Sequence, residues 1–217
     1  MATVTQIKKT YIDHVLTHGK APDSVYLFAK KLKITESEFY QSFASFTAIE
    51  RSIWADLMLE AITQVKAGEE WRTFSAREKM LSFFYSFTEW LKTQRSFVIY
   101  TLNNKPSRLA APSALAEVKP LFESFSEDIV LEGLDSGELA DRKFFSKRYK
   151  DALWLQFIFI LDFWKNDDSL GFEKTDEAIE KGINVTFDLF QRSPLDQLFE
   201  YGKFITRNSK LRQKTGF

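Results

Sequence analysis

Two histidines near the start of the chain have a spacing that occurs in metal sites. His14 and His18 are the chain's two histidines, and residues four apart lie on one face of a helix. No third ligand is nearby, and Val15 stands where the zinc-protease pattern H-E-x-x-H requires glutamate. We therefore expect no metal and no other cofactor, and we expect both histidines to lie on the surface or to face phosphates.

The chain offers few residues for covalent catalysis. It has no cysteine and no G-x-S-x-G nucleophile elbow. His14 and His18 are its two imidazole side chains that could act as a general base. Neither of the glycine-rich patterns that cradle nucleotide phosphates is present. Asp167 and Asp168 stand in an expected turn, where a carboxylate usually caps a helix. We therefore expect a protein that is not an enzyme.

Lysine and hydrogen-bonding side chains gather early in the chain in a pattern suited to DNA. Between Met1 and Lys33 there are six lysines and two aspartates, which leaves this segment at a net charge of +4. The whole chain has a formal net charge of zero, so the positive charge is local. We expect contacts to bases or phosphates from Lys30, Lys33, Thr35, Glu36, Ser37, Tyr40 and Gln41.

Two acidic residues in this region oppose that expectation. Glu36 and Glu38 are repelled by phosphates, which weakens DNA binding. A carboxylate can also accept a hydrogen bond from the N4 amino group of cytosine. Because of Glu36 and Glu38, this segment could either bind DNA or have lost DNA binding, and both alternatives stay open.

Apolar spacing and capping residues predict three short helices that would position these side chains. The first covers about 5–17. The second begins at the pair Asp23-Ser24 and covers about 24–32. Thr35 and Glu38 form a capping-box pattern, which begins a third helix. Two short helices joined by a tight turn, packed on a preceding helix, form the unit that lays its last helix in a major groove.

From Gly19 to Phe43 the sequence resembles the helix-turn-helix of the TetR (tetracycline-repressor-like) family without a gap. The matching positions are Gly19, Ser24, Val25, Ala29, Ile34, Thr35, Tyr40 and Phe43. The family usually has glycine where this chain has Lys33, and small or basic residues where it has Glu36 and Glu38. A left-handed lysine in the turn costs about 1 kcal/mol. The resemblance implies an N-terminal head that binds DNA.

Beyond residue 48 the sequence predicts helices almost throughout, because glycine and proline are rare and apolar residues recur at helical spacing. The expected helices are 53–65, 76–93, 120–134, 144–164 and 176–192, and residues 94–118 are expected to form a helix end and a loop. The absence of cysteine and of an apolar run of membrane length predicts a cytoplasmic protein.

The segment EGLDSGELADR, followed by two long helices, resembles the C-terminal domain of the same family. In that family these helices pair with their copies across a twofold axis, which implies a homodimer. Leu153, Phe157 and Ile160 are interface candidates.

Aromatic side chains come from helices that surround a cavity in this family, and an apolar or aromatic small molecule would suit them. The candidates are Phe83, Phe87, Trp90, Phe97, Tyr100, Trp154, Phe157 and Phe159. The alternative is that most of them simply form the hydrophobic core.

We therefore expect an all-α protein with a helix-turn-helix DNA-binding domain at 1–48 and a larger helical ligand-binding and dimerisation domain at 49–217. The expected function is that of a ligand-responsive transcriptional regulator, a repressor in most of the family, that binds operator DNA as a homodimer. The alternative is a TetR-like fold that has lost operator binding and acts through protein contacts or as a small-molecule-binding module. A helical enzyme with a buried aromatic site is a third hypothesis, which lacks a catalytic pair.

Overall fold

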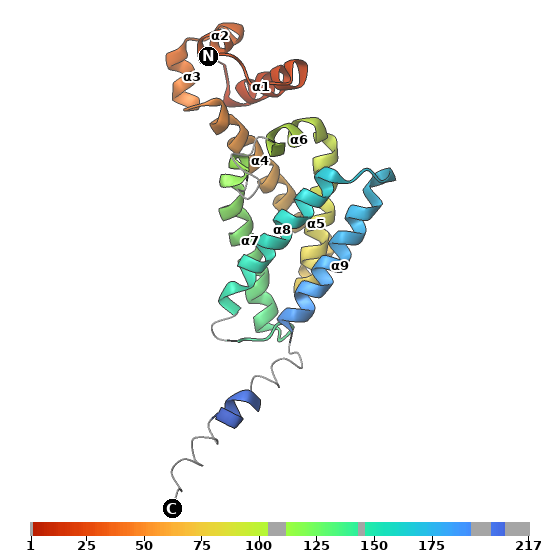
Figure 1. Cartoon of the computed structure of the whole chain (residues 1–217). Coiled ribbons are helices and arrows are strands. Elements are labelled where there is room, and N and C mark those ends of the chain that lie inside the picture. Colours follow the sequence, from red (N-terminus) through yellow and green to blue (C-terminus); the bar gives the residue numbers. More distant parts are fainter. Residues whose placement is uncertain (1, 104–111, 143–145, 192–200, 207–217) are drawn as a thin grey trace, which may run out of the picture.

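Helices make up the regular structure of the chain. The computed structural model describes residues 2–103, 112–142, 146–191 and 201–206, and within these ranges it contains helices and no strand. The helices are arranged along one long axis, with α1, α2 and α3 at one end (Figure 1). The all-α fold predicted from the sequence is confirmed.

Four helices begin the chain: α1 (Val4–His18), α2 (Val25–Leu32), α3 (Glu36–Ser42) and α4 (Phe46–Ala67). At the start of each, a side-chain oxygen accepts a hydrogen bond from a backbone N–H of the first turn. These capping residues are Thr3, Ser24, Thr35 and Ser45. The caps satisfy amides that have no partner inside the helix. The three predicted short helices and the Thr35–Glu38 capping box are confirmed.

The rest of the described chain forms five further labelled helices, short 3-10 turns and a helical segment at 201–206. The helices are α5 (Ala76–Thr93), α6 (Arg95–Asn103), α7 (Val118–Asp135), α8 (Tyr149–Asn166) and α9 (Glu173–Phe190). The 3-10 turns are η1 (Glu69–Arg72), η2 (Ser113–Ala116), η3 (Ser146–Arg148) and η4 (Leu170–Phe172). Across the described ranges, none of the helices combines the length and the apolar character needed to span a bilayer.

Some predicted boundaries were wrong. Helix α6 occupies part of the segment expected to be a helix end and a loop, because burial of Phe97, Val98 and Leu102 stabilises this short helix. Helix α4 begins at Phe46, well before residue 53, because Ser45 caps it there. The expected helix start at Phe144 and helix end at Arg192 lie outside the described residues.

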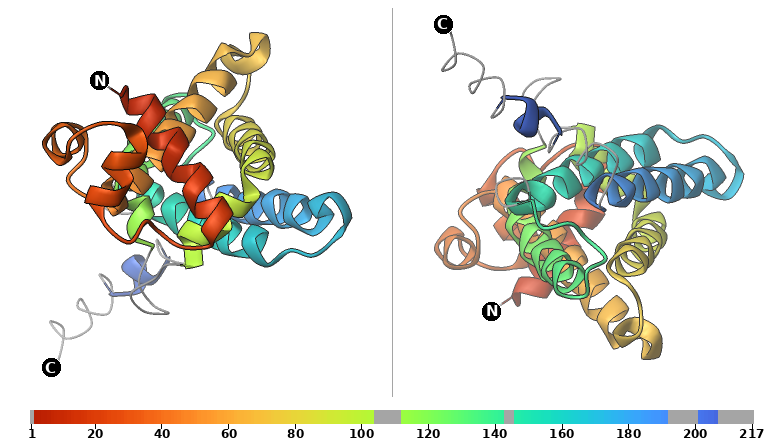
Figure 2. Two further views of the ribbon diagram at one scale, coloured as in Figure 1. Left: turned by 90° about the horizontal axis from the view of Figure 1, so that it is seen from above. Right: turned by 90° about the horizontal axis from the view of Figure 1, so that it is seen from below.

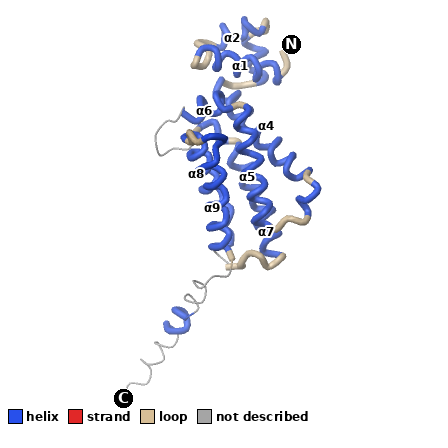
Figure 3. The backbone as a smooth tube through the Cα atoms, turned by 90° about the vertical axis from the view of Figure 1, so that its right-hand side faces the viewer, coloured by secondary structure: helices blue, strands red, loops and turns tan. Residues whose placement is uncertain are grey.

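The buried side chains form two clusters. The head cluster consists of Ile7, Tyr11, Val15, Phe28, Ala29, Leu32, Phe39, Phe43, Ile49, Ile53, Leu57 and Phe97. The larger body cluster is built from α4 to α9 and the segments between them. Helix α4 contributes Ile53 to the first cluster and Trp54 to the second, and α6 likewise contributes Phe97 and Val98. Both helices therefore connect the head to the body, as their position in Figure 3 shows.

Helices α8 and α9 form an antiparallel pair on one side of the body (Figure 2). The turn between them is held by Asp167, whose carboxylate accepts hydrogen bonds from the backbone N–H and hydroxyl groups of Ser169 and Thr175. Burial alone would raise the pKa of Asp167, but these hydrogen bonds outweigh burial and hold the pKa well below its ordinary value. Of the two aspartates expected to cap, Asp167 accepts from the Thr175 N–H in the first turn of α9, whereas Asp168 pairs with Lys174.

Candidate nucleic-acid interface

The helix-turn-helix unit is fixed by aromatic packing beneath it. The rings of Phe28 in α2 and Phe39 in α3 meet edge to face, with centroids 6.1 Å apart. Phe46 at the start of α4 contacts both rings and also stacks on Tyr11 of α1. Edge-to-face and offset contacts are the preferred arrangements of aromatic pairs. The packing fixes α2 and α3 against α1 and α4, so their outer faces keep a defined orientation.

The structure brings the predicted DNA-contacting residues together at one end of the molecule (Figure 1). Thr35 caps α3 and is exposed, and the four residues predicted in α3 are exposed as well: Glu36, Ser37, Tyr40 and Gln41. Lys30 and Lys33 are exposed at the end of α2, directly before α3. Side chains on the exposed face of such a helix are placed to reach bases and phosphates.

The lysines of the head differ in whether they have an acidic partner. Lys8 binds Asp56, Lys20 binds Asp23 at 2.6 Å, and Lys31 lies 3.7 Å from Asp13. Among the described residues, no ion pair involves Lys30 or Lys33. Lys30 and Lys33 are therefore the head lysines of the predicted set with charge available for a phosphate.

The two glutamates of α3 have different environments. The Glu38 carboxylate accepts a hydrogen bond from the backbone N–H of Thr35 at 2.8 Å and from its hydroxyl at 3.0 Å. The backbone hydrogen bond and then the hydroxyl lower the pKa of Glu38 from its usual value. Glu36 is exposed, and no hydrogen bond or ion pair joins its side chain to another described residue. Of these two glutamates, Glu38 is therefore the one whose carboxylate is engaged with other described residues.

A buried polar contact lies between the head and the body. The Tyr11 hydroxyl donates a hydrogen bond to Glu50 Oε1 at 2.7 Å, and the Glu50 residue is 3% exposed. Burial raises the pKa of Glu50, although the hydrogen bond from Tyr11 acts in the opposite direction. Phe97 of α6 also meets the Tyr11 ring edge to face, with centroids 6.5 Å apart. The contact thus links α1, α4 and α6.

Sequence reasoning did not identify this contact. It treated Tyr11 only as an apolar position and did not consider Glu50. The available signal was that Glu50 shares a helix face with Ile53, Trp54 and Leu57, where a carboxylate needs a partner.

Four of the predicted ligand-contacting residues form one group of touching rings in the body. Phe83, Phe87, Trp154 and Phe157 are buried, and the centroids of Phe87 and Phe157 are 5.3 Å apart. Phe122 of α7, which sequence reasoning missed, lies 4.8 Å from Phe157 and 5.7 Å from Phe83. These rings fill the centre of the body cluster.

The other predicted ligand-contacting residues lie elsewhere. Phe97 contacts Tyr11, and Tyr100 packs against the head cluster. Trp90 donates a hydrogen bond from Nε1 to Gln64 Oε1 at 2.7 Å. Phe159 is 55% exposed on the outside of α8. The structure therefore divides the predicted set between the body core, the junction and the surface.

The side of the α8–α9 pair that faces away from the body exposes apolar residues. Leu155 and Phe159 of α8 are 69% and 55% exposed, and Val185 and Leu189 of α9 are 59% and 53% exposed. We call these four residues the α8–α9 face. Gly182 of α9 lies against Gln156 of α8: a Cβ atom at residue 182 would be 2.1 Å from Gln156 Nε2. Glycine at this position therefore allows the two helices to approach closely.

The residues predicted for the dimer interface do not belong to the α8–α9 face. Leu153, Phe157 and Ile160 are buried in the core of their own chain, at 2% exposure or less. They are turned toward the body, so they cannot contact a second copy. The choice of these three residues was therefore wrong.

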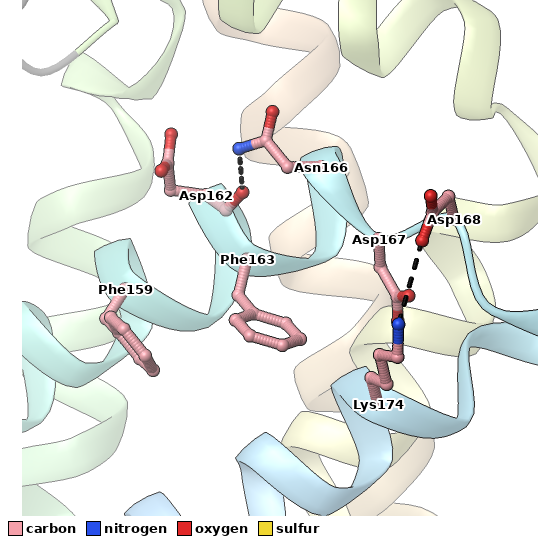
Figure 4. A pocket seen from close by; sticks show the side chains of 7 residues that line it. All are labelled: Phe159, Asp162, Phe163, Asn166, Asp167, Asp168 and Lys174. Atoms are coloured by element: carbon pink, nitrogen blue, oxygen red, sulfur yellow. Dashed lines mark hydrogen bonds and ion pairs between the residues drawn. The ribbon is translucent and has the colours of Figure 1, made fainter.

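An open hollow of about 330 Å³ lies at the end of the α8–α9 face (Figure 4). It is lined by Phe159, Asp162, Phe163, Asn166, Asp167, Asp168 and Lys174. Asn166 donates a hydrogen bond to the carbonyl oxygen of Asp162, and Lys174 pairs with Asp168 at 3.8 Å. Apart from Phe159, none of the predicted ligand-contacting residues lines it.

The two histidines stack on each other. Their ring centroids are 4.2 Å apart, and His18 Nδ1 donates to the carbonyl oxygen of His14. The described residues contain no group of three or more histidine, cysteine, aspartate or glutamate side chains that could hold a metal ion.

A helix-turn-helix head joined to a larger helical body is the architecture of a class of transcription regulators. Residues 79–205 match the family model described as the tetracyclin repressor-like C-terminal domain, which is more than half of the 217 residues. The chain belongs to the TetR family.

Solved structures have the same fold. A candidate TetR family transcription regulator from Shewanella sp. PV-4 superposes with a TM-score of 0.60 at 12% identity, over 88% of this chain and 100% of the other. A protein of unknown function from Rhodococcus sp. RHA1 superposes with a TM-score of 0.57 at 12% identity, over 88% and 97% of the two chains. No curated protein sequence matches the chain.

Proposed function

We propose that the chain is a ligand-responsive transcriptional regulator, and specifically a repressor, that binds operator DNA as a homodimer in the cytoplasm. The observation that carries the proposal is the outer face of α3, where four exposed polar side chains follow two lysines with no described acidic partner. Lysines that position a recognition helix on phosphates, with polar side chains toward the bases, are the arrangement by which helix-turn-helix proteins read DNA.

We assign DNA binding to residues 1–48, and ligand binding and dimerisation to residues 49–217. The division is one of function, because the head cluster includes Ile49, Ile53 and Leu57 of α4 and Phe97 of α6. A shared core of this kind supports mechanical coupling between the two parts.

A second copy of the chain is the partner we assign to the α8–α9 face. The face carries Leu155, Phe159, Val185 and Leu189, each more than half exposed. Exposed apolar residues gathered on one helix pair favour an interaction site. A twofold pair of such faces would bury it and place two heads on one DNA duplex, as helix-turn-helix dimers require.

The effector we propose is an apolar or aromatic small molecule that binds among the rings around Phe122. These rings touch one another, so a ligand must displace some of them. Phe83 and Phe87 are part of α5, which contacts both α4 and α6. Displacement would therefore shift the helices that connect to the head and change the populations of two head positions.

A protein-interaction module is the second candidate function. Tyr26 and Leu27 of α2 are 58% and 55% exposed, and Glu36 adds a negative charge to the same head. Exposed apolar residues on the head favour contact with a protein more than contact with phosphates.

Binding of the purified protein to DNA from upstream of its own gene tests the proposal, with a Lys30→Ala/Lys33→Ala variant as comparison. We expect the wild type to bind one duplex specifically. The variant should bind more weakly, and its affinity should depend less on salt. The slope of log affinity against log salt concentration should be shallower by about 0.9 for each phosphate that the variant no longer neutralises. Absence of specific binding, with and without apolar aromatic compounds, would support the protein-interaction module instead.

A further inference from the structure

We infer that Glu36 selects a cytosine in the DNA half-site that α3 contacts, and that Glu38 takes no part in base selection. The inference rests on the DNA-binding function proposed above and adds a sequence preference to it. The two carboxylates stand two residues apart on α3, and among the described residues Glu38 has hydrogen-bond partners for its carboxylate whereas Glu36 has none.

The Glu38 carboxylate is turned back toward the start of its own helix. Its Oε2 atom accepts hydrogen bonds from the backbone N–H and the hydroxyl of Thr35, while the Thr35 oxygen accepts from the Glu38 N–H at 3.2 Å. A base contact would require the Glu38 carboxylate to leave Thr35, and the backbone N–H of Thr35 would then lose its partner. Glu38 therefore has a structural role.

Glu36 has no such engagement. It is the first residue of α3, it is exposed, and its carboxylate has no hydrogen-bond or ion-pair partner among the described residues. In helix-turn-helix proteins the N-terminal residues of the recognition helix contact base edges. Tyr40, one turn further along α3, is 53% exposed on the same side. Glu36 is thus the acidic side chain of α3 that is available to a base.

The chemistry of base edges selects the partner. An ionised carboxylate only accepts hydrogen bonds, and guanine and thymine present acceptors in the major groove, so they repel it. Adenine presents the N6 amino donor next to the N7 acceptor, which opposes the second carboxylate oxygen. Cytosine presents the N4 amino donor without an acceptor on its own edge. Cytosine is therefore the base that Glu36 accommodates best.

The cost of a carboxylate near phosphates is offset by neighbouring lysines. Lys30 and Lys33 are exposed at the end of α2 and have no described acidic partner. Phosphate contacts from these lysines supply affinity that does not depend on sequence. Glu36 lowers that general affinity and in return discriminates between bases.

The test compares the wild type with Glu36→Ala and with Glu38→Gln as a matched control. Both variants remove one negative charge from α3, and glutamine at residue 38 can keep the capping box. Duplexes that bind the wild type are selected from a library with random half-sites. The dissociation constant of each protein is then measured on a selected duplex and on duplexes in which each C·G pair is replaced in turn by T·A.

We expect one C·G pair whose replacement weakens wild-type binding about tenfold, a typical value for a good base contact. Glu36→Ala should lose that preference, with less than about a twofold difference between the duplexes, while Glu38→Gln keeps it. Glu38→Gln should bind every duplex more tightly than the wild type, because it lacks a charge that phosphates repel.

Retention of the full cytosine preference by Glu36→Ala would overturn the inference, and so would its loss in Glu38→Gln. These results differ from failure of the proposed function, in which the wild type enriches no duplex sequence. That last result would overturn both proposals.

Discussion

Lys33 combines backbone strain with a charge that the proposed function uses. Its φ of 58° and ψ of 38° place it in the left-handed region at the end of α2, where a residue with a Cβ atom is disfavoured by about 1 kcal/mol. The strain follows from the tight turn between α2 and α3.

We expect Lys33→Gly to stabilise the protein by up to about 1 kcal/mol, with part of the gain offset by the greater flexibility of glycine in the unfolded chain. The same variant should bind DNA more weakly. Urea unfolding and DNA titration measure the two effects. Lys30→Ala is the control, because Lys30 lies inside α2: it should weaken DNA binding without relieving any backbone strain. A Lys33→Gly protein no more stable than the wild type would argue against strain at this turn.

Tyr11 is the hydrogen-bond partner of the buried Glu50 carboxylate. Tyr11→Phe should lower the free energy of unfolding by about 1–3 kcal/mol, the cost of leaving a buried polar group without its partner. Burial raises the pKa of Glu50 in the folded protein. The contribution of Glu50 to the free energy of unfolding is therefore complete below the unfolded pKa of about 4.3. It is lost as the pH rises from there through the folded pKa.

The Tyr11→Phe variant removes a hydrogen bond that opposes the rise in the pKa of Glu50. The loss of stability should therefore be larger at pH 8 than at pH 5, as measured by urea unfolding. Glu50→Gln, which keeps an acceptor for Tyr11 and removes the buried charge, should not show this pH dependence. Equal losses for Tyr11→Phe at both pH values would mean that Glu50 is not the group responsible.

Individual residues show where sequence reasoning succeeds. Thr35 and Glu38 were predicted as a capping box because that contact is local and depends only on spacing. The partnership of Tyr11 with Glu50 joins residues far apart in the sequence, so no local pattern contains it. The same spacing also separates Glu38, which belongs to the capping box, from Glu36, which does not.

Among the helices, the α8–α9 turn depends on Asp167. We expect Asp167→Asn to lower the free energy of unfolding by about 1–3 kcal/mol at pH 7, because the carboxylate accepts four hydrogen bonds across the turn. Its pKa is lowered in the folded protein, so its stabilisation is complete above the unfolded pKa of about 4 and is lost as pH falls further.

The stability difference between wild type and Asp167→Asn should therefore shrink at pH 3. Asp168→Asn is the matched control, because the Asp168 side chain is 94% exposed and pairs with Lys174 at 3.8 Å, so it should change stability little. A difference for Asp167→Asn that is equally large at pH 3 and pH 7 would show that the carboxylate charge is not what holds the turn.

Helix positions followed from periodicity, but the orientation of α8 did not. Apolar residues occupy both sides of this helix, with Leu153 and Phe157 in the core and Leu155 and Phe159 exposed. When a helix is apolar on both sides, spacing alone does not tell which side meets the body. Helix α6 was missed for a related reason, because a short helix gains its stability from tertiary packing.

For the assembly, the α8–α9 face predicts a homodimer. Leu155→Glu and Phe159→Glu place a charge on this face and should convert the dimer into a monomer, because burying an unpaired charge at an interface is costly. Leu131→Glu changes a residue of α7 with 54% exposure away from this face, and it should leave the dimer intact. Light scattering after size-exclusion chromatography gives the mass of each species. Dimers in all three variants would place the interface elsewhere.

The fold class and the family followed from local patterns that recur along the chain. The packing of the predicted ligand-contacting residues did not, since Phe122 joins rings of α5 and α8 from a separate helix. Which aromatic residues meet depends on how helices cross, and this is a property of the assembled body.

The decisive measurement is a titration of the wild-type protein with its selected duplex and with a scrambled duplex, at about 50 mM and about 200 mM salt. We predict that the selected duplex binds at least about a thousandfold more tightly than the scrambled one at the higher salt. Affinity for both should fall as salt increases, because lysine contacts release counterions from phosphates. Equal affinity for the two duplexes, or no complex at either salt concentration, would contradict a role in reading operator DNA.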